Sequence, residues 1–138
     1  MTSPIEKVQF ASLEWLDLAR GVLEELVAEH GEVGTSFSVC EVFTNAPSGT
    51  IGTDSDNAAW HFRIVGTQVT VGEGEIDGAD MSITVDYSKA LPMAKRVYPE
   101  FLGWLVVPLL RVISLFRGKP SAPAYLMDLH NRLALVTQ

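Results

Sequence analysis

Apolar residues recur at helical spacing over residues 12–30 and alternate with polar residues over most of residues 35–87. The helix is predicted to begin at Ser12, whose hydroxyl can accept a hydrogen bond from a free first-turn amide, and Gly31 is placed to end it. Its apolar positions are Leu13, Leu16, Leu23, Leu26 and Val27. The pattern therefore predicts an amphipathic helix with one face for a core and an acidic side toward solvent.

The alternating region predicts four strands separated by turn residues. The first lies within residues 35–44, and the next two form a hairpin around Gly66. The fourth runs from Met81 to Tyr87 after an Asp77-Gly78 turn. Because each strand has one apolar face, the sheet needs a cover on that side, and the fold class is α/β in the broad sense, more narrowly α+β.

Further helices are predicted after the strands, and they complete the cover. Ser88 is placed to cap a short helix that runs toward Arg96, Pro99 can begin another, and a last helix spans residues 124–136. Residues 101–116 are apolar nearly all round but are shorter than the roughly 20 residues of a membrane-spanning helix. They are therefore expected to be buried on most sides or to dock on another apolar surface.

Length, net charge and cysteine count exclude several classes of function. The 138 residues are expected to form a single domain, 1–138, and the net charge of -7 argues against a nucleic-acid partner, which would need basic groups to neutralise phosphates. One cysteine excludes an intrachain disulfide, and the first ten residues lack the apolar stretch of a signal peptide. A cytoplasmic location is expected. No metal or other cofactor is expected, because the three histidines are far apart and form no helical pair.

Charge is strongly segregated along the chain. Residues 1–88 hold 3 basic and 15 acidic side chains, whereas residues 89–119 hold 6 basic and 1 acidic. The basic segment is also the most apolar, with Phe101, Trp104, Leu105 and Leu109 among its residues. Its apolar side chains suit a lipid tail, and its cations suit an anionic group or an anionic membrane surface; these cations include Arg111, Arg117 and Lys119. The alternative is a core helix or a homodimer interface with basic ends in water.

Glu41 interrupts the apolar face of the first strand and is the leading candidate for acid-base chemistry. In an apolar pocket its pKa would rise, so that it could act as a general acid or base or hold a ligand hydroxyl. The alternative is that a bulge turns Glu41 to solvent or that Arg63 pairs with it. His61 is a second, weaker candidate, expected on the other face of the sheet or among ordinary outer polar residues. Cys40 is expected to be an inert thiol.

Two stretches of this sequence resemble the sterol carrier protein type-two superfamily. One is Ala58-Ala59-Trp60 followed by alternating apolar residues, a glycine turn and Val69-Thr70-Val71; the other is Ala79-Asp80-Met81-Ser82-Ile83-Thr84-Val85 leading into a helix. The step Phe116-Arg117-Gly118-Lys119 is also similar to one that precedes the final strand in that family. The sequence departs from the family at Pro120 and Pro123, where a fifth strand is expected, and in a longer apolar insertion around residues 101–115.

The resemblance implies a sheet of about five strands, mainly antiparallel, with helices on one face and an apolar pocket between them. In that pocket a fatty acid, acyl-coenzyme A, sterol or other lipid-like ligand would bind, without a cofactor or covalent chemistry. The ligand-binding residues that the resemblance implies are Trp60, Phe62, Met81, Ile83 and Val85, with C-terminal helices over them. The apolar and basic segment adds Phe101, Trp104, Leu105 and Leu109 to the predicted pocket and Arg111, Arg117 or Lys119 at an anionic end. A carrier or pathway accessory protein is thus expected rather than an enzyme. The alternatives are a small isomerase, hydratase or cyclase using Glu41 or His61, and a homodimeric assembly subunit.

Overall fold

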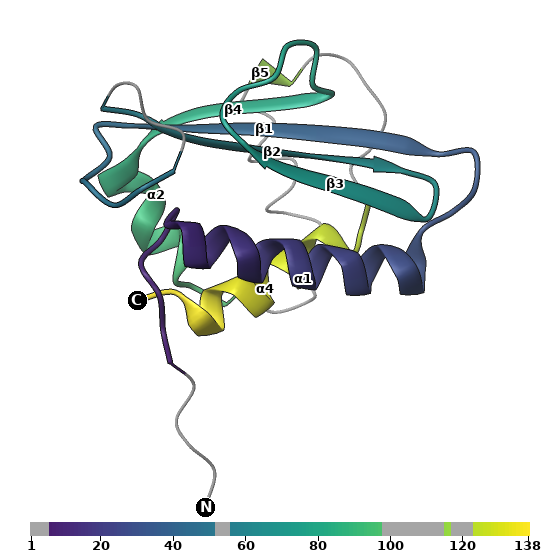
Figure 1. Cartoon of the computed structure of the whole chain (residues 1–138), viewed down its shortest axis with the longest axis horizontal. Helices are drawn as coiled ribbons and strands as arrows, with labels where there is room; N and C mark the ends of the chain where they lie inside the picture. The colour runs from purple at the N-terminus through teal and green to yellow at the C-terminus, as the bar shows by residue number, and fades with distance from the viewer. Residues whose placement is uncertain (1–5, 52–55, 98–114, 117–122) are drawn as a thin grey trace, which may run out of the picture.

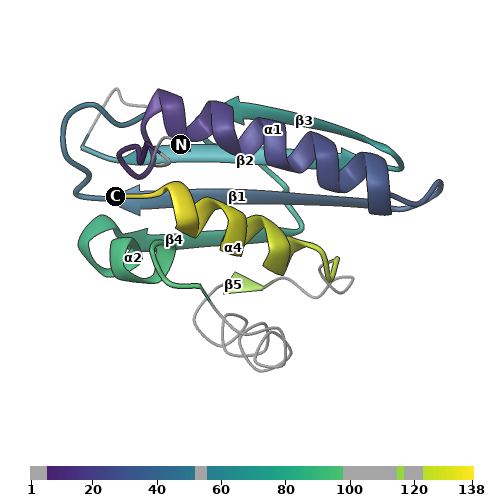
Figure 2. The ribbon, with the colours of Figure 1, turned by 90° about the horizontal axis from the view of Figure 1, so that it is seen from below.

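A computed structural model of the chain describes residues 6–51, 56–97, 115–116 and 123–138. These residues form an α+β fold in which three helices lie on one face of an open mixed sheet (Figure 1). Figure 2 shows the molecule from the helical side. Helix α1 (Leu13–His30) crosses strands β2 (Ala58–Val65) and β3 (Gln68–Glu73), and helix α4 (Leu126–Val136) lies over strands β1 (Ser36–Thr44) and β4 (Met81–Asp86). The predicted fold class is confirmed at this level.

Helix α1, Leu13–His30, forms where the apolar spacing predicts it. The Ser12 hydroxyl accepts a hydrogen bond from the Trp15 amide at 3.2 Å, which satisfies one of the free first-turn donors. At the other end the Gly31 amide donates to the Val27 carbonyl. A Cβ at position 31 would lie 2.5 Å from the Gly66 carbonyl oxygen. Glycine is therefore needed at the end of the helix, where the chain passes close to the turn between β2 and β3.

Four strands of six to nine residues make up most of the sheet: β1 Ser36–Thr44, β2 Ala58–Val65, β3 Gln68–Glu73 and β4 Met81–Asp86. Their order is β3-β2-β1-β4, and the two-residue β5, Leu115–Phe116, pairs antiparallel with the start of β4. The pairings β1–β2 and β2–β3 are antiparallel, whereas β1–β4 is parallel. The sheet is therefore mixed, and its parallel pair joins the middle strand β1 to β4.

A short crossover over the outer face makes the parallel pairing feasible. β3 ends at Glu73, level with Glu41 of β1, and β4 begins at Met81, level with Val39. The chain must therefore move sideways by three strand spacings, about 14 Å, with little return along the strands. Residues 74–80 span that distance without a helix, and Ile76 and Ala79 pack on a small outer cluster formed by Cys40, Val42 and Ala59. The predicted Asp77-Gly78 turn lies within this crossover.

The crossover is fixed to the sheet where β4 begins. The Asp80 carboxylate accepts hydrogen bonds from the Ser38 amide at 2.9 Å and the Ser38 hydroxyl at 3.3 Å, and the Asp80 amide donates to that hydroxyl at 3.0 Å. Ser38 is buried and stands one residue before the first β4 partner on β1. The Asp80 side chain thus supplies the acceptor that a longer β4 would have supplied from its backbone.

Asp80→Ala is expected to lower the free energy of unfolding by about 1–3 kcal/mol, because it leaves the buried Ser38 amide without an acceptor. Urea denaturation followed by circular dichroism measures the change. Asp77→Ala, at an exposed position of the same crossover, removes an equal charge and is the control. Equal losses in the two variants would show that the Asp80–Ser38 contact does not stabilise the crossover.

Two predictions about the chain after β4 are wrong in detail. Helix α2, Tyr87–Ala94, is capped by the Asp86 carboxylate, which accepts from the Ser88 amide at 2.9 Å, and not by Ser88. Leu115 and Phe116, predicted at the end of the apolar helical segment, form β5 instead. The predicted helix from Pro99 and the strand region at Pro120 lie outside the described residues. Among the described helices, none is both long and apolar enough to cross a bilayer.

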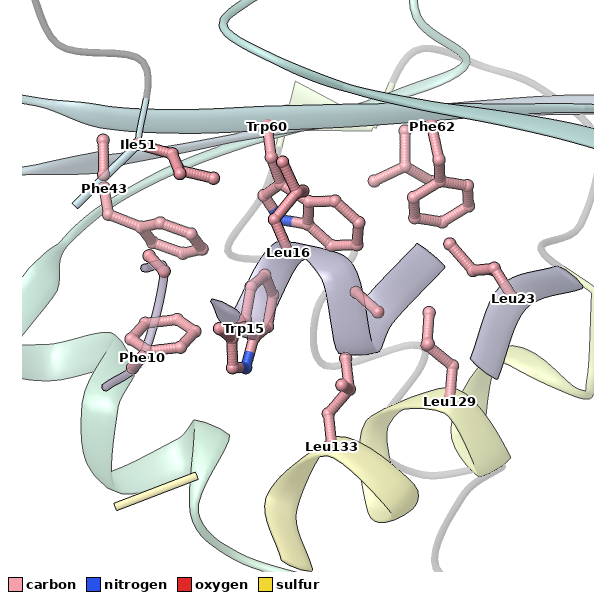
Figure 3. Packing of buried hydrophobic residues seen from close by; sticks show 14 of the residues in the cluster. Phe10, Trp15, Leu16, Leu23, Phe43, Ile51, Trp60, Phe62, Leu129 and Leu133 are labelled. Atoms are coloured by element: carbon pink, nitrogen blue, oxygen red, sulfur yellow. The ribbon is translucent and has the colours of Figure 1, made fainter. Parts of the chain in front are cut away.

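Residues from both ends of the described chain pack together in the core (Figure 3). Trp15 meets Phe10 and Trp60 edge-on, at ring-centroid distances of 5.2 and 5.1 Å, and its indole N–H donates to the hydroxyl of the buried Thr137 at 3.2 Å. Leu129 and Leu133 of helix α4, Leu126–Val136, reach the same core. The predicted last helix is thus confirmed, and it docks beside α1.

Candidate functional site

Glu41 lies on the face of the sheet that the helices cover. In the continuous β1–β2 register it pairs with Trp60, and in the β1–β4 register it pairs with Ile83. Its neighbours two residues away, Val39 and Phe43, are buried on that same face. Arg63 stands opposite Ser38 and is exposed. The sequence alternatives of a bulge or of an Arg63 pair at Glu41 are therefore wrong.

The Glu41 carboxyl has one hydrogen-bond partner among the described residues, the indole of Trp60. The Trp60 Nε1–H donates to Glu41 Oε1 at 2.7 Å. Trp60 is only 2% exposed, and its ring also contacts Phe62 at a centroid distance of 5.2 Å. The donor that reaches Glu41 is thus held rigidly by the core, and Glu41 Oε2 is left with no hydrogen-bond partner in the described part of the chain.

The surroundings of Glu41 disfavour its charged form. Burial raises the pKa of Glu41 from 4.5 to about 7, and the hydrogen bond from Trp60 offsets part of that rise. Glu41 as a whole residue is nevertheless only partly buried. A carboxyl that is strongly desolvated yet still reachable can exchange protons and hydrogen bonds with a bound molecule near neutral pH.

A strip of apolar side chains on β4 borders Glu41. Met81, Ile83 and Val85 share the covered face and are all partly exposed, whereas Phe62 and Ile64 of β2 are 3% and 2% exposed. Figure 2 shows β4 on the side of the sheet away from α1. Val69 and Val71 on the same face of β3, the opposite edge of the sheet, are partly exposed as well. Glu41 therefore stands between the closely packed side chains of β2 and the partly exposed side chains of β4.

The structure brings together some of the ligand-binding residues implied by the family resemblance. Met81, Ile83 and Val85 lie beside Glu41 on one face, while Trp60 and Phe62 are closely packed in the core. Seven further predicted residues lie outside the described residues or, as side chains, are not described: Phe101, Trp104, Leu105, Leu109, Arg111, Arg117 and Lys119.

His61 lies on the opposite face of the sheet from Glu41. Its Nδ1 is 2.9 Å from the Gly74 carbonyl oxygen, and its ring covers Gly72, where a Cβ would come within 2.8 Å of Nε2. His61 thus holds the start of the crossover, and the sheet separates it from Glu41. The two candidates for acid-base chemistry do not share a site.

Other polar groups have structural partners. Cys40 is buried on the outer face, and that burial, with smaller contributions from nearby carboxylates, raises the pKa of its thiol, which suits the expected inert role. His130 Nε2 is 2.9 Å from the Arg96 carbonyl oxygen, and burial lowers the pKa of this imidazole. Across the described ranges, no group of three or more His, Cys, Asp or Glu side chains is arranged to hold a metal ion.

The partnership of Trp60 with Glu41 is the site feature that the sequence analysis missed. Both residues share the covered face, but they lie on different strands, and only the register places them opposite each other. A tryptophan on the strand next to the unexpected carboxyl was the available signal, because a buried indole N–H requires an acceptor.

These residues define a class: an α+β domain whose mixed sheet carries a desolvated carboxyl on its covered apolar face. Comparisons with protein-family models, curated proteins and solved structures gave no significant match to this chain. The chemistry of the Glu41 site is therefore the basis for a proposed function.

Proposed function

We propose that this protein binds a hydrophobic small molecule, such as a fatty acid, acyl-coenzyme A, sterol or other lipid-like compound, as a carrier or pathway accessory protein. The ligand lies between the covered face of the sheet and the C-terminal segments. The observation that carries the proposal is the position of Glu41, a desolvated but reachable carboxyl beside the partly exposed apolar strip of β4.

Physical chemistry supports a ligand at this strip. Partly exposed apolar side chains on the covered face of a sheet gain free energy when further apolar surface covers them, by about 25 cal/mol for each Å² removed from water. Small-molecule sites are mostly apolar and contain a few fixed polar groups that set orientation. Met81, Ile83 and Val85 supply the apolar surface in this proposal, and Glu41 with Trp60 supplies the polar group.

The resemblance to the sterol carrier protein type-two superfamily supports the same proposal. It implies about five strands, helices on one face and an apolar pocket between the two layers. In the proposal β5 is the start of the fifth strand. The segment from Phe101 to Lys119, which is expected to cover the ligand, lies outside the described residues apart from Leu115 and Phe116. Arg111, Arg117 and Lys119 there would meet an anionic end of the ligand or an anionic membrane surface.

Ile83→Trp is expected to weaken binding of the neutral fluorescent probe Nile red by about tenfold or more, because the larger side chain would occupy the position that the proposal assigns to the ligand beside Glu41. Thr84→Trp makes the same residue at the next position of β4, exposed on the other face, and is the matched control. Fluorescence titration measures both affinities, and circular dichroism verifies the fold. Equal affinities in the two variants would place the ligand elsewhere.

Native mass spectrometry of protein purified without detergent tests the function directly. A co-purified lipid, acyl thioester or sterol-like molecule near one per chain is expected, and its release under denaturing conditions identifies its chemical class. A ligand-free homodimer would instead favour an assembly subunit, the alternative in which the apolar C-terminal segment buries against a second copy.

A second candidate function is an isomerase, hydratase or cyclase that acts on a hydrophobic substrate in the same place. The observation that favours it is the pKa of Glu41 near 7, which suits a general acid or base at neutral pH. Glu41 would act without His61, which lies across the sheet. Turnover of a bound substrate that Glu41→Gln abolishes, without loss of binding, would establish the enzyme and exclude a simple carrier.

A further inference from the structure

The second carboxyl oxygen of Glu41, Oε2, is available to a ligand. Oε1 receives the Trp60 N–H at 2.7 Å, and within the described residues Oε2 has no hydrogen-bond partner. A carboxylate has acceptor capacity for about four hydrogen bonds and donates none. The group therefore offers an acceptor to whatever molecule lies against β4.

We propose that Glu41 selects the ligand by accepting a hydrogen bond from it, so that the preferred ligand is a neutral apolar molecule with a hydroxyl group at the end that reaches β1. This inference rests on the proposed function, because it requires a ligand on the β4 strip. It places the polar end of the ligand at Glu41 rather than at Arg111, Arg117 or Lys119.

The electrostatics around Glu41 favour a neutral donor over an anion. The residues beside it on the covered face, Val39, Phe43, Trp60 and Ile83, carry no charge. In the described part of the chain no cationic side chain contributes to the ionisation of Glu41. A ligand carboxylate placed here would meet a like charge in apolar surroundings, and that interaction is repulsive.

The geometry also favours a single contact with the ligand. Trp60 is held by the core and donates to Oε1, so Oε2 is the oxygen that remains for a ligand hydroxyl. A hydrogen bond from a hydroxyl to a charged acceptor is expected to change affinity by about tenfold or more. A ligand of equal length that lacks only the donor should therefore bind distinctly more weakly.

Three ligands with the same twelve-carbon chain test this: 1-dodecanol, its methyl ether 1-methoxydodecane, and dodecanoate. Each is titrated at pH 8.5 against Nile red bound to the whole chain, and displacement gives its affinity. The alcohol is expected to bind about tenfold or more tightly than either the ether or the carboxylate. The ether has a methyl group in place of the hydroxyl hydrogen, so it keeps the oxygen but cannot donate, and the carboxylate adds the negative charge.

Two variants assign the preference to Glu41. Glu41→Leu removes the acceptor and is expected to bring the alcohol and the ether within about threefold of each other. Glu41→Gln removes only the charge and is expected to strengthen dodecanoate binding by about tenfold. It also keeps an acceptor for Trp60, so it remains informative if the leucine variant does not fold. Glu75→Gln, on the exposed crossover, removes an equal charge and should leave all three affinities unchanged.

The outcomes distinguish a failure of ligand selection by Glu41 from a failure of the proposed function. If Nile red and all three ligands fail to bind the unsubstituted protein, the proposed function is wrong. If Nile red binds but the alcohol shows no advantage over the ether, or if Glu41→Gln leaves the alcohol-to-carboxylate ratio unchanged, ligand selection by Glu41 is wrong while hydrophobic ligand binding stands.

Discussion

The stability of Glu41→Gln relative to the unsubstituted protein is expected to grow by about 2 kcal/mol between pH 5.5 and pH 8.5. The cause is that burial raises the pKa of Glu41 from 4.5 to about 7. Between these values the folded state holds a proton that the unfolded state releases, so folding becomes less favourable as pH rises. Above pH 7 both states are ionised and the loss levels off at about 3 kcal/mol.

Urea denaturation of both proteins at several pH values measures this difference. The comparison starts at pH 5.5 because the calculated isoelectric point is 4.8, where a protein is least soluble. Glu75→Gln, on the exposed crossover, shows the part of the effect that comes from net charge alone. A difference between Glu41→Gln and the unsubstituted protein that does not vary with pH would mean that Glu41 is solvated in the folded protein, and the site argued from it would fail.

Leu23→Ala is expected to cost about 2–5 kcal/mol of unfolding free energy, a second large effect. Leu23 lies in the middle of α1, is 0% exposed and belongs to the core between the helix and the sheet (Figure 3). Truncation removes buried methyl groups and leaves a cavity that neighbouring side chains fill only partly. Thermal and urea unfolding of the two proteins give the change.

Leu18→Ala provides the matched control for that measurement. It is the same substitution on the same helix, at a residue that is 38% exposed. The expected loss is below about 1 kcal/mol, because little apolar surface is re-exposed and alanine favours the helix. Similar losses at positions 18 and 23 would show that α1 does not dock through the face assigned to the core.

Local sequence patterns predicted most of the individual elements. Helix α1 with its Ser12 cap, the four longer strands and the last helix follow from apolar spacing and turn residues, which depend on neighbours only a few positions away. The helix after β4 was predicted, but its cap was assigned to Ser88. Asp86, two residues earlier, has the same capping ability, and the sequence pattern alone does not decide between two polar residues so close together.

Relations between distant segments were not predictable in this way. The parallel pairing of β1 with β4 depends on how the crossover lies over the outer face, and no alternation of apolar residues encodes it. The same limit applies to the site. The sequence identified Glu41 as an exception on an apolar face, but its hydrogen bond to Trp60 follows from the β1–β2 register. β5 pairs with β4 through backbone hydrogen bonds, which any residue can form. Its two apolar residues continue the apolar run before them, so their pattern did not distinguish a strand from the end of a helix.

The parallel β1–β4 pair also has a kinetic consequence. β1, β2 and β3 pair with strands next in sequence, whereas Val39 must find Met81 across two intervening strands and the crossover. Closing the longer loop costs more chain entropy, so the three-stranded meander is expected to form first and β4 to join it late. The last part to close is in general among the easiest to open locally. Because β4 borders Glu41, local opening of β4 would expose the Glu41 carboxyl to solvent without unfolding the rest of the sheet.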